Sequence, residues 1–326
     1  MIIHRTRRNR KTAAIRKLVE ETFLRPADFV MPFFIIEGEN RKEEIKSLPG
    51  VYRLSIDLVL KEAEKYHKLG VPAMALFPVI DPAKKDAMGS EALNENGLTS
   101  RALEALKTEI PSLCLITDIA LDPFTSHGHD GVVDSDGDVL NDTTVDLLCK
   151  MSTLLGFAGA DIVAPSDMMD GRIGAIRRAL DSSKMEDVGI LSYSAKYASA
   201  LYSPFRDALG SSLKFGDKKT YQMNPANSRE AVREALIDVE EGADMLMVKP
   251  ALFYLDIIGK IKEATHLPIC AYHVSGEYAM VMAASGWLDA PKVFHEALLS
   301  IKRAGADFIF SYAIPQVLPF LELKTF

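Results

Sequence analysis

The sequence predicts an α/β protein, a parallel (β/α)8 TIM barrel with an extended N-terminal arm. Eight apolar runs follow one another along the chain, each of the length of one buried strand. Stretches with helical periodicity separate most of these runs, as in a parallel sheet whose strands are joined by helices. A repeat supports the series, because the tripeptide Gly-Ala-Asp begins three of the segments, at Gly159, Gly242 and Gly305.

The expected strands are apolar along most of their length, which is typical of strands that are buried on both faces. In chain order they occupy residues 29–37, 73–79, 113–121, 159–166, 188–196, 242–250, 267–275 and 305–312. An open, doubly wound sheet is the alternative arrangement. No G-x-G-x-x-G follows the first run, however, so a dinucleotide site of the kind found in such sheets has no support.

Helices are expected between the strands, and residues 227–242 show the helical pattern best. Asn227 is a plausible N-cap, Glu230 follows three residues later, and apolar side chains then recur on one helical face. Gly242 ends this helix, and Asp244 begins the turn into the next strand. The Gly-Ala-Asp repeat is therefore interpreted as a helix-to-strand connection that the chain uses repeatedly.

Length and charge limit the domain organisation and the partners. The 326 residues, 48 % of them hydrophobic, can bury one large core or two smaller ones. Residues 1–28 are too few for a domain and are expected to form the arm, whereas residues 29–326 are expected to form the catalytic barrel. The net charge of -7 disfavours nucleic acid or an anionic membrane as a partner, and no run of about 18 apolar residues predicts a membrane span. The N-terminus lacks the apolar stretch of a signal peptide, so we expect the protein in the cytoplasm.

Polar side chains end several of the expected strands, and in (β/α)8 barrels these strand ends carry the chemistry. The residues concerned are Asp118, Ser166, Lys196, Lys249, Ser275, Ser311 and Tyr312. Two of them are lysines, at the ends of the fifth and sixth expected strands. Because neighbouring strands lie about 4.8 Å apart, we expect both amines in one cavity.

Two amines in one apolar cavity favour covalent chemistry on carbonyl groups. Each ammonium group disfavours the charge of the other and burial acts in the same direction, so the pKa falls from about 10.4 toward 7 to 8. A neutral amine attacks a carbonyl carbon and forms a Schiff base. A single strand-end lysine could instead serve an ion pair or a phosphate contact. One Schiff base indicates an aldolase, and two indicate two carbonyl substrates.

Six long motifs carry more specific information. They are DPFTSHGHDGVV, DIVAPSDMMDGRIGAIR, YSAKYASALYSPFRDALGS, YQMNPANSREA, ADMLMVKPALFYLDII and PICAYHVSGEYAM. Together with the arm segment RTRRNRKTAAIRKLVEET, they resemble the porphobilinogen synthase family, also called 5-aminolevulinate dehydratase. The resemblance covers nearly the whole chain. It implies a (β/α)8 lyase that condenses two molecules of 5-aminolevulinate to porphobilinogen, with loss of two waters, in tetrapyrrole synthesis.

The resemblance also implies roles for single residues. Lys249 would first bind the substrate that supplies the propionate side, and Lys196 would bind the one that supplies the acetate side. Asp118 resembles a carboxylate that helps proton transfer and holds the substrate amino group. The carboxylate of the acetate-side substrate would contact Arg206, Lys218 and Gln222, and the other carboxylate would contact Ser275 and Tyr312. Residues 208–220 suit an active-site lid.

The chain departs from its zinc-dependent relatives at three positions. Where those relatives have cysteines, it has Ala120, Asp122 and Asp130, so a zinc site of the sulfur type cannot form. Oxygen ligands favour Mg²⁺, which needs only one or two carboxylates, and we expect a cysteine-free magnesium-type variant. The alternative is that no metal binds there and the aspartates bind the substrate amine directly. Glu234 matches the family's allosteric Mg²⁺ ligand.

The expected assembly is an oligomer, and two functions other than the dehydratase stay open. The resemblance implies a homo-octamer built from dimers that the arms embrace. A class I aldolase would use Lys249 alone on one carbonyl substrate, which leaves Lys196 and Arg206 without a role. A non-catalytic barrel would use the lysines only to bind an anion.

Overall fold

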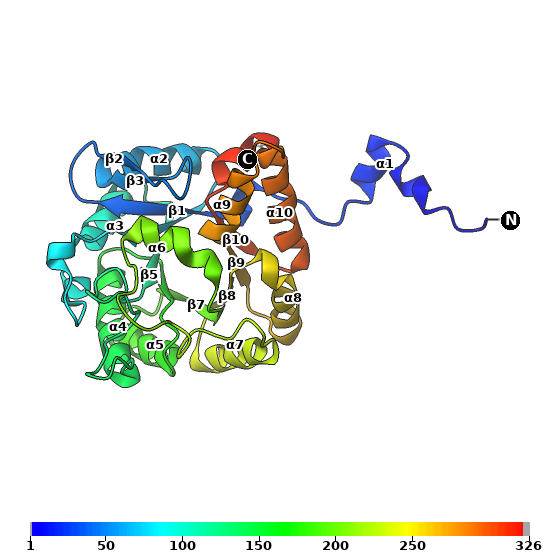
Figure 1. The fold of residues 1–326 in the computed structure, drawn as a ribbon. Coiled ribbons are helices and arrows are strands. Elements are labelled where there is room, and N and C mark those ends of the chain that lie inside the picture. Colours follow the sequence, from blue (N-terminus) through cyan, green and yellow to red (C-terminus); the bar gives the residue numbers. More distant parts are fainter. Residues whose placement is uncertain (1, 322–326) are drawn as a thin grey trace.

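The computed structural model describes residues 2–321, and within this range the chain forms a closed parallel barrel (Figure 1). Each barrel strand pairs in parallel with the next, and the last strand pairs with the first, which closes the barrel. The predicted barrel is thereby confirmed. Its strands are β1 (Phe29–Ile36), β4 (Ala73–Pro78), β5 (Cys114–Ile119), β6 (Ile162–Pro165), β7 (Gly189–Lys196), β8 (Met245–Lys249), β9 (Ile269–His273) and β10 (Phe308–Ser311).

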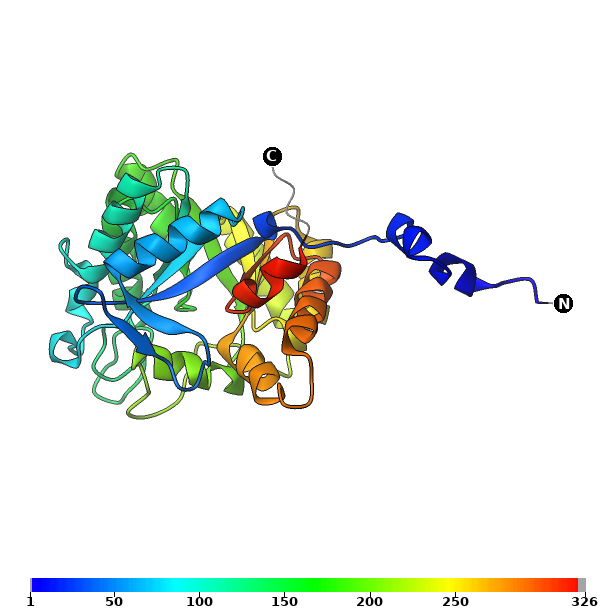
Figure 2. The same cartoon turned by 90° about the horizontal axis from the view of Figure 1, so that it is seen from above.

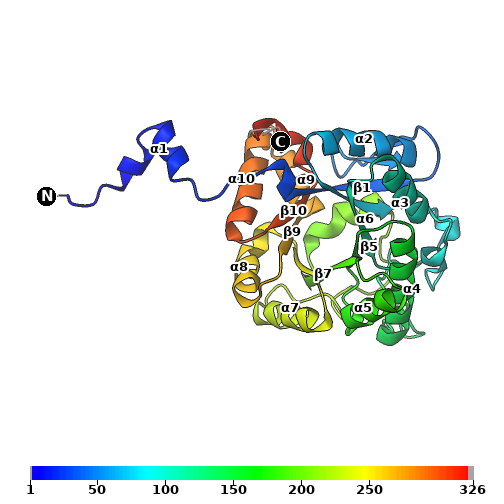
Figure 3. The same cartoon turned by 180° about the vertical axis from the view of Figure 1, so that it is seen from behind.

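Helices surround the barrel, because their apolar faces cover the outward side chains of the strands (Figures 1 and 3). The outer helices are α2 (Ile56–Lys68), α3 (Leu98–Glu109), α4 (Asn141–Phe157), α5 (Arg172–Ser182), α7 (Arg229–Glu241), α8 (Leu255–Ala264) and α10 (Ala290–Ala304). Shorter helices follow the strand ends: η5 (Ala200–Tyr202), α6 (Ser203–Leu209), η6 (Leu252–Tyr254), α9 (Ser275–Ala283), α11 (Ile314–Val317) and η7 (Leu318–Phe320). Three more turns of 3-10 helix lie at η2 (Pro26–Asp28), η3 (Pro82–Lys84) and η4 (Ser90–Leu93).

A small hairpin between β1 and α2 was not predicted from the sequence. Its strands are β2 (Lys42–Glu44) and β3 (Tyr52–Ser55), and β3 pairs in parallel with the last residues of β1. β2 consists of three charged residues and β3 of four residues, so neither has the apolar run by which the barrel strands were recognised. The hairpin extends the sheet beside the C-terminal end of β1.

The Gly-Ala-Asp repeat has a common hydrogen-bonding role. In each copy the aspartate accepts a hydrogen bond from a backbone N–H of the preceding strand. Asp161 accepts from Leu115, Asp244 from Ile190 and Asp307 from Ile269, each at 2.7 Å. The glycines have φ values of +109°, +101° and +121°, which L-residues with side chains rarely adopt. The motif therefore ends a helix and then joins the next strand to its neighbour.

The N-terminal segment extends away from the barrel (Figures 1 and 2). It contains η1 (Thr6–Arg10) and α1 (Ala13–Leu18), and Ile3, Leu18 and Phe23 are 75 %, 84 % and 59 % exposed. Residues 322–326, which we assigned to the barrel domain, lie outside the described residues. Within residues 2–321 no helix is both long enough and apolar enough to cross a membrane.

The shared role of the repeat gives a test of stability. Asp244→Ala removes the acceptor of the Ile190 N–H, and we expect the free energy of unfolding to fall by about 1–2 kcal/mol. Asp244→Asn keeps a side-chain oxygen and should cost less. Urea unfolding measures both, with Asp187→Ala at an exposed loop aspartate as the control. An Asp244→Ala protein as stable as this control would show that the hydrogen bond contributes nothing.

Candidate active site

The two strand-end lysines lie side by side. Lys196 ends β7, Lys249 ends β8, and the two residues are direct partners in the parallel pairing. Both side chains are buried, each with 5 % of its surface exposed. The structure therefore brings both amines into the same end of the barrel, as the spacing of parallel strands requires.

A β-bulge turns Lys196 into the barrel. Ser192 points outward, where its hydroxyl donates to Asp238 of α7 at 2.5 Å, and Tyr193 points inward toward the amine of Lys249. Strict alternation would then turn Lys196, three residues after Tyr193, to the outside. The register of β7 against β8 shifts by one residue between Ser192 and Ala195, and this extra residue restores the inward direction.

Four aromatic rings surround the amine of Lys249. The distances from its Nζ atom to the ring centroids are 5.0 Å for Tyr193, 5.2 Å for Tyr202, 4.9 Å for Phe205 and 4.8 Å for Tyr272. Burial among these rings lowers the pKa of Lys249 to about 7, and the neighbouring amine of Lys196 acts in the same direction. This amine is therefore neutral in a large fraction of molecules at neutral pH.

Lys196 lies between a carbonyl group and a carboxylate. Its amine donates to the backbone oxygen of Ser166, at the end of β6, and lies 3.8 Å from Oδ2 of Asp130. Asp118, near the end of β5, interacts electrostatically with both lysines. Burial raises the pKa of Asp118 to about 6, although the charge of Lys249 opposes this rise. A carboxyl group with this pKa can both donate and accept protons near neutral pH.

Lys218 holds the two remaining aspartates of the site together. Its amine lies 3.0 Å from Oδ1 of Asp130 and 3.7 Å from Oδ2 of Asp122. Burial alone would raise the pKa of Asp130, but Lys196 and Lys218 hold it down at about 2. The pKa of Asp122 is raised, by burial and by repulsion from Asp130.

The donor set at Asp122 and Asp130 does not fit a metal ion. Lys218 occupies the space between the two carboxylates, and Lys196 approaches Asp130 from the other side. Across residues 2–321, no group of three or more His, Cys, Asp or Glu side chains is arranged to hold a metal. A divalent ion at this position would have to displace a lysine that already supplies the compensating charge.

The predicted carboxylate-binding residues form two groups, which differ in the hydrogen bonds that they already make within the protein. Arg206 on α6 is half-buried, and its guanidinium forms no ion pair or hydrogen bond within the described chain. Gln222 is buried, and its side-chain oxygen also lacks a partner among residues 2–321. Ser275 accepts from the N–H of Phe205 at 3.0 Å, and the hydroxyls of Tyr272 and Tyr312 lie 2.9 Å apart.

Glu234 lies outside the barrel, on α7, away from the other predicted residues. It is half-buried, and burial and the neighbouring Asp238 raise its pKa, whereas Arg172 lowers it. Asp170, before α5, is a further acidic neighbour. The structure thus separates Glu234 from the two lysines, as expected for a site that is distinct from the active site.

Sequence analysis missed several residues of the site. The motifs around the two lysines contain aromatic residues, but nothing in the sequence showed that Tyr202, Phe205 and Tyr272 would enclose one amine. It also missed Glu277, which is fully buried and accepts from the N–H groups of Ala251, Leu252 and Val274. Burial raises the pKa of Glu277 to about 8, against the effect of these N–H groups. The S-G-E-Y segment, which begins at the last residue of the seventh expected strand, was the available signal.

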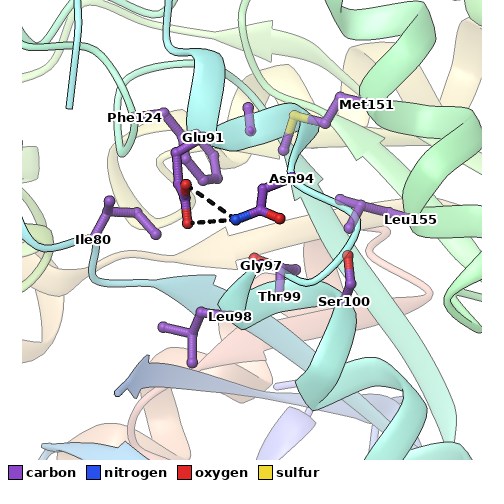
Figure 4. A pocket seen from close by; sticks show the side chains of 11 residues that line it. Ile80, Glu91, Asn94, Gly97, Leu98, Thr99, Ser100, Phe124, Met151 and Leu155 are labelled. Atoms are coloured by element: carbon purple, nitrogen blue, oxygen red, sulfur yellow. Dashed lines mark hydrogen bonds between the residues drawn. The ribbon is translucent and has the colours of Figure 1, made fainter. Parts of the chain in front are cut away.

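A separate small cavity lies under η4, between α3 and α4 (Figure 4). Asn94 donates to Glu91 at its edge, and the hydroxyls of Thr99 and Ser100 lack partners within the described chain. Its volume of about 10 Å³ suits one water molecule and no substrate.

The lowered pKa of Lys249 predicts the pH dependence of its reactivity. About nine tenths of this amine is neutral at pH 8 and about one tenth at pH 6, so its labelling by acetic anhydride should fall as pH falls through 7. Lys196→Met removes the neighbouring amine and should move the midpoint upward. Peptide mass spectrometry gives the midpoint, and a wild-type midpoint near 10 would contradict the assignment.

Comparison with known proteins identifies the family. A model of delta-aminolevulinic acid dehydratase matches residues 3–320. The delta-aminolevulinic acid dehydratase of Chlamydia pneumoniae is 56 % identical over 98 % of this chain and 96 % of its own length. That of Bradyrhizobium diazoefficiens is 52 % identical over 96 % of this chain and 89 % of its own.

A solved structure agrees with these relatives. The delta-aminolevulinic acid dehydratase (porphobilinogen synthase) of Toxoplasma gondii, in complex with the reaction product porphobilinogen, superposes with a TM-score of 0.96 at 50 % identity. The match covers 98 % of this chain and 92 % of that one. The resemblance found in the motifs is confirmed at the level of the family. The chain belongs to the delta-aminolevulinic acid dehydratase family.

Proposed function

We propose that this protein is a lyase that condenses two molecules of 5-aminolevulinate to porphobilinogen, with loss of two waters. The observation that carries the proposal is the pair of buried lysines on adjacent strands, of which Lys249 has a pKa of about 7. The family and the product bound to the Toxoplasma relative support the same reaction. Two ketone substrates give each lysine a carbonyl partner.

The first substrate reacts with Lys249. Its neutral amine adds to the ketone carbon, and the resulting carbinolamine loses water to form an imine. Asp118, with a pKa of about 6, is suited to give a proton to the leaving hydroxyl and to take one back afterwards. The aromatic rings around the amine exclude bulk water, which would hydrolyse the imine.

The second substrate reacts with Lys196 in the same way. Asp130, which keeps its negative charge, stabilises the iminium nitrogen that forms 3.8 Å away. Each imine makes the neighbouring carbon acidic, so that one carbon–carbon and one carbon–nitrogen bond can join the two substrates. Both lysines are released again, and the net change is the loss of two waters.

The substrate carboxylates have separate partners. The guanidinium of Arg206 has no hydrogen-bond or ion-pair partner within residues 2–321, and with Gln222 it would bind the carboxylate of the substrate on Lys196. Lys218 is already paired with Asp122 and Asp130, so its contribution is shared with them. Ser275 and Tyr312 would donate hydroxyl groups to the carboxylate of the substrate on Lys249.

We further propose that the active site works without a metal and that Mg²⁺ binds at Glu234. Lys218 supplies the positive charge at Asp122 and Asp130, which leaves these aspartates to hold the substrate amine. At Glu234 a half-buried carboxylate lies near Asp170 and Asp238, and Mg²⁺ accepts one or two carboxylates together with several waters. Bound Mg²⁺ would offset the repulsion among these carboxylates.

We propose a homo-octamer in the cytoplasm. The apolar residues Ile3, Leu18 and Phe23 of the arm are mostly exposed within residues 2–321 and extend from the barrel, which suits packing against another subunit. Cys114, Cys149 and Cys270 are all unpaired thiols, as is usual in a reducing compartment.

A single-lysine aldolase is the second candidate, and it is favoured only by the reactivity of Lys249 itself. Lys249→Met should abolish porphobilinogen formation and keep the fold, because it removes the amine that the four aromatic rings enclose. Lys196→Met should also abolish it. The pyrrole colour assay measures product, and borohydride trapping with mass spectrometry maps the adduct. An enzyme that keeps substantial turnover without Lys196 would support the aldolase instead.

The proposed Mg²⁺ site predicts an effect of chelation on assembly and activity. A chelator should lower turnover and shift the sedimentation coefficient to smaller species, because the repulsion around Glu234 returns. Glu234→Gln should give the same activity with and without chelator. Glu240→Gln, at an exposed position on the same helix, is the matched control. Unchanged turnover and sedimentation of the wild type in chelator would contradict the proposed Mg²⁺ site at Glu234.

A further inference from the structure

Half of the aromatic enclosure around Lys249 comes from outside the barrel wall. Tyr193 and Tyr272 belong to strands β7 and β9, whereas Tyr202 and Phe205 belong to residues 200–209, which we call the α6 segment. The α6 segment lies across the end of the barrel where the two lysines are (Figures 1 and 2). It therefore closes the site from the solvent side.

Phe205 connects the α6 segment to the interior of the barrel. Its ring meets Phe77 edge-on at 5.3 Å between centroids and lies 5.7 Å from Phe34. Those two rings belong to β4 and β1, which lie across the barrel from β8 and β7. Phe205 is only half-buried, so its outer edge borders solvent while its inner face covers the amine.

Hydrogen bonds and close packing fix the α6 segment at both ends. At its start Ser275 of α9 accepts from the N–H of Phe205, and Gly276 packs so closely that a Cβ atom there would lie 2.5 Å from the carbonyl oxygen of Leu201. At its end Arg53 of β3 donates to the carbonyl oxygens of Asp207 and Ala208, at 2.8 Å and 2.7 Å.

The charged groups that act on Lys249 do not belong to the α6 segment. They are Lys196, Asp118, Asp122 and Asp130, and they stand on β5, on β7 and on the loop after β5. The other titratable groups at the amine are the phenols of Tyr193, Tyr202 and Tyr272, whose pKa values burial raises well above 10. Arg206 is the charged residue that the α6 segment itself brings to the site. Displacement of this segment would thus chiefly admit water.

We propose that Phe205 is a positioning residue that completes the water-excluding wall around the Lys249 amine, so that this amine is a nucleophile only while the α6 segment covers it. The role of Lys249 as the nucleophile rests on the proposed function, whereas the exclusion of water by Phe205 does not. An amine that water reaches regains its proton, because burial is the largest cause of its lowered pKa.

The reactivity of the Lys249 amine then depends on whether the α6 segment covers it. Before closure the amine is an ammonium ion, which does not attack a ketone and attracts the substrate carboxylate. After closure it loses its proton and reacts. The cover therefore restricts imine formation to substrate that is already enclosed.

Competitive labelling with acetic anhydride tests the proposal without a ketone substrate. The pH midpoint for acetylation of Lys249 reports its protonation, while altered access changes only the amplitude. Phe205→Ala should raise the midpoint by about one pH unit or more, which means a tenfold smaller neutral fraction at neutral pH. Phe205→Leu keeps an apolar side chain and should restore most of the effect.

Two further variants keep the result interpretable. Phe215→Ala is the matched control, because this neighbouring phenylalanine lies 5.2 Å from the ring of His129 and not at Lys249. Its midpoint should equal that of the wild type. Arg53→Ala loosens the α6 segment without touching the enclosure and should raise the midpoint. If Phe205→Ala and Arg53→Ala both keep the wild-type midpoint, the proposal is wrong.

Failure of the proposed function has a different signature. In that case wild-type protein gives no borohydride-trapped adduct with 5-aminolevulinate, whatever the labelling midpoints are. A raised pH midpoint for Lys249 acetylation in Phe205→Ala would then still establish that Phe205 excludes water from this amine.

Discussion

The position of Lys196 opposite Lys249 is the constraint on which the rest of the site depends. A parallel barrel brings the ends of β7 and β8 together, but pairing alone does not decide which side chains point inward. The bulge between Ser192 and Ala195 does, because it lets both Tyr193 and Lys196 face the interior while Ser192 faces the outer helices. Without the extra residue, only one amine would reach the cavity.

Two buried amines so close together repel each other when both are charged, and the site surrounds each of them with different groups. Lys196 lies beside Asp130, an ionised carboxylate that Lys218 also holds. Lys249 has four aromatic rings around its amine and forms no ion pair within residues 2–321. Burial without an ion-pair partner favours the neutral form of an amine, whereas a carboxylate partner favours the charged form. The two lysines thus differ in environment although the strands place them symmetrically.

The barrel and the lysines could be predicted from the sequence, because both depend on local patterns. Continuous apolar runs mark strands that are buried on both faces, and Lys196 and Lys249 each end such a run. The bulge in β7, the hairpin and the enclosure by Phe205 could not be predicted. They depend on contacts between distant segments, and β2 in particular has no apolar residue to mark it. The pairing of Lys218 with Asp122 and Asp130 likewise joins residues about 90 positions apart.

Through the hairpin, the position of the α6 segment over the site can change independently of the lysines and aspartates at the strand ends. Arg53 holds the last turn of α6 from β3, a strand that lies outside the barrel proper and contributes no group to the reaction. Changes in the length or tilt of this hairpin would move the α6 segment toward or away from the lysines and aspartates, which stay in place. Residues 37–55 are therefore where natural variation or engineering could adjust the size of the enclosed volume without altering the chemistry.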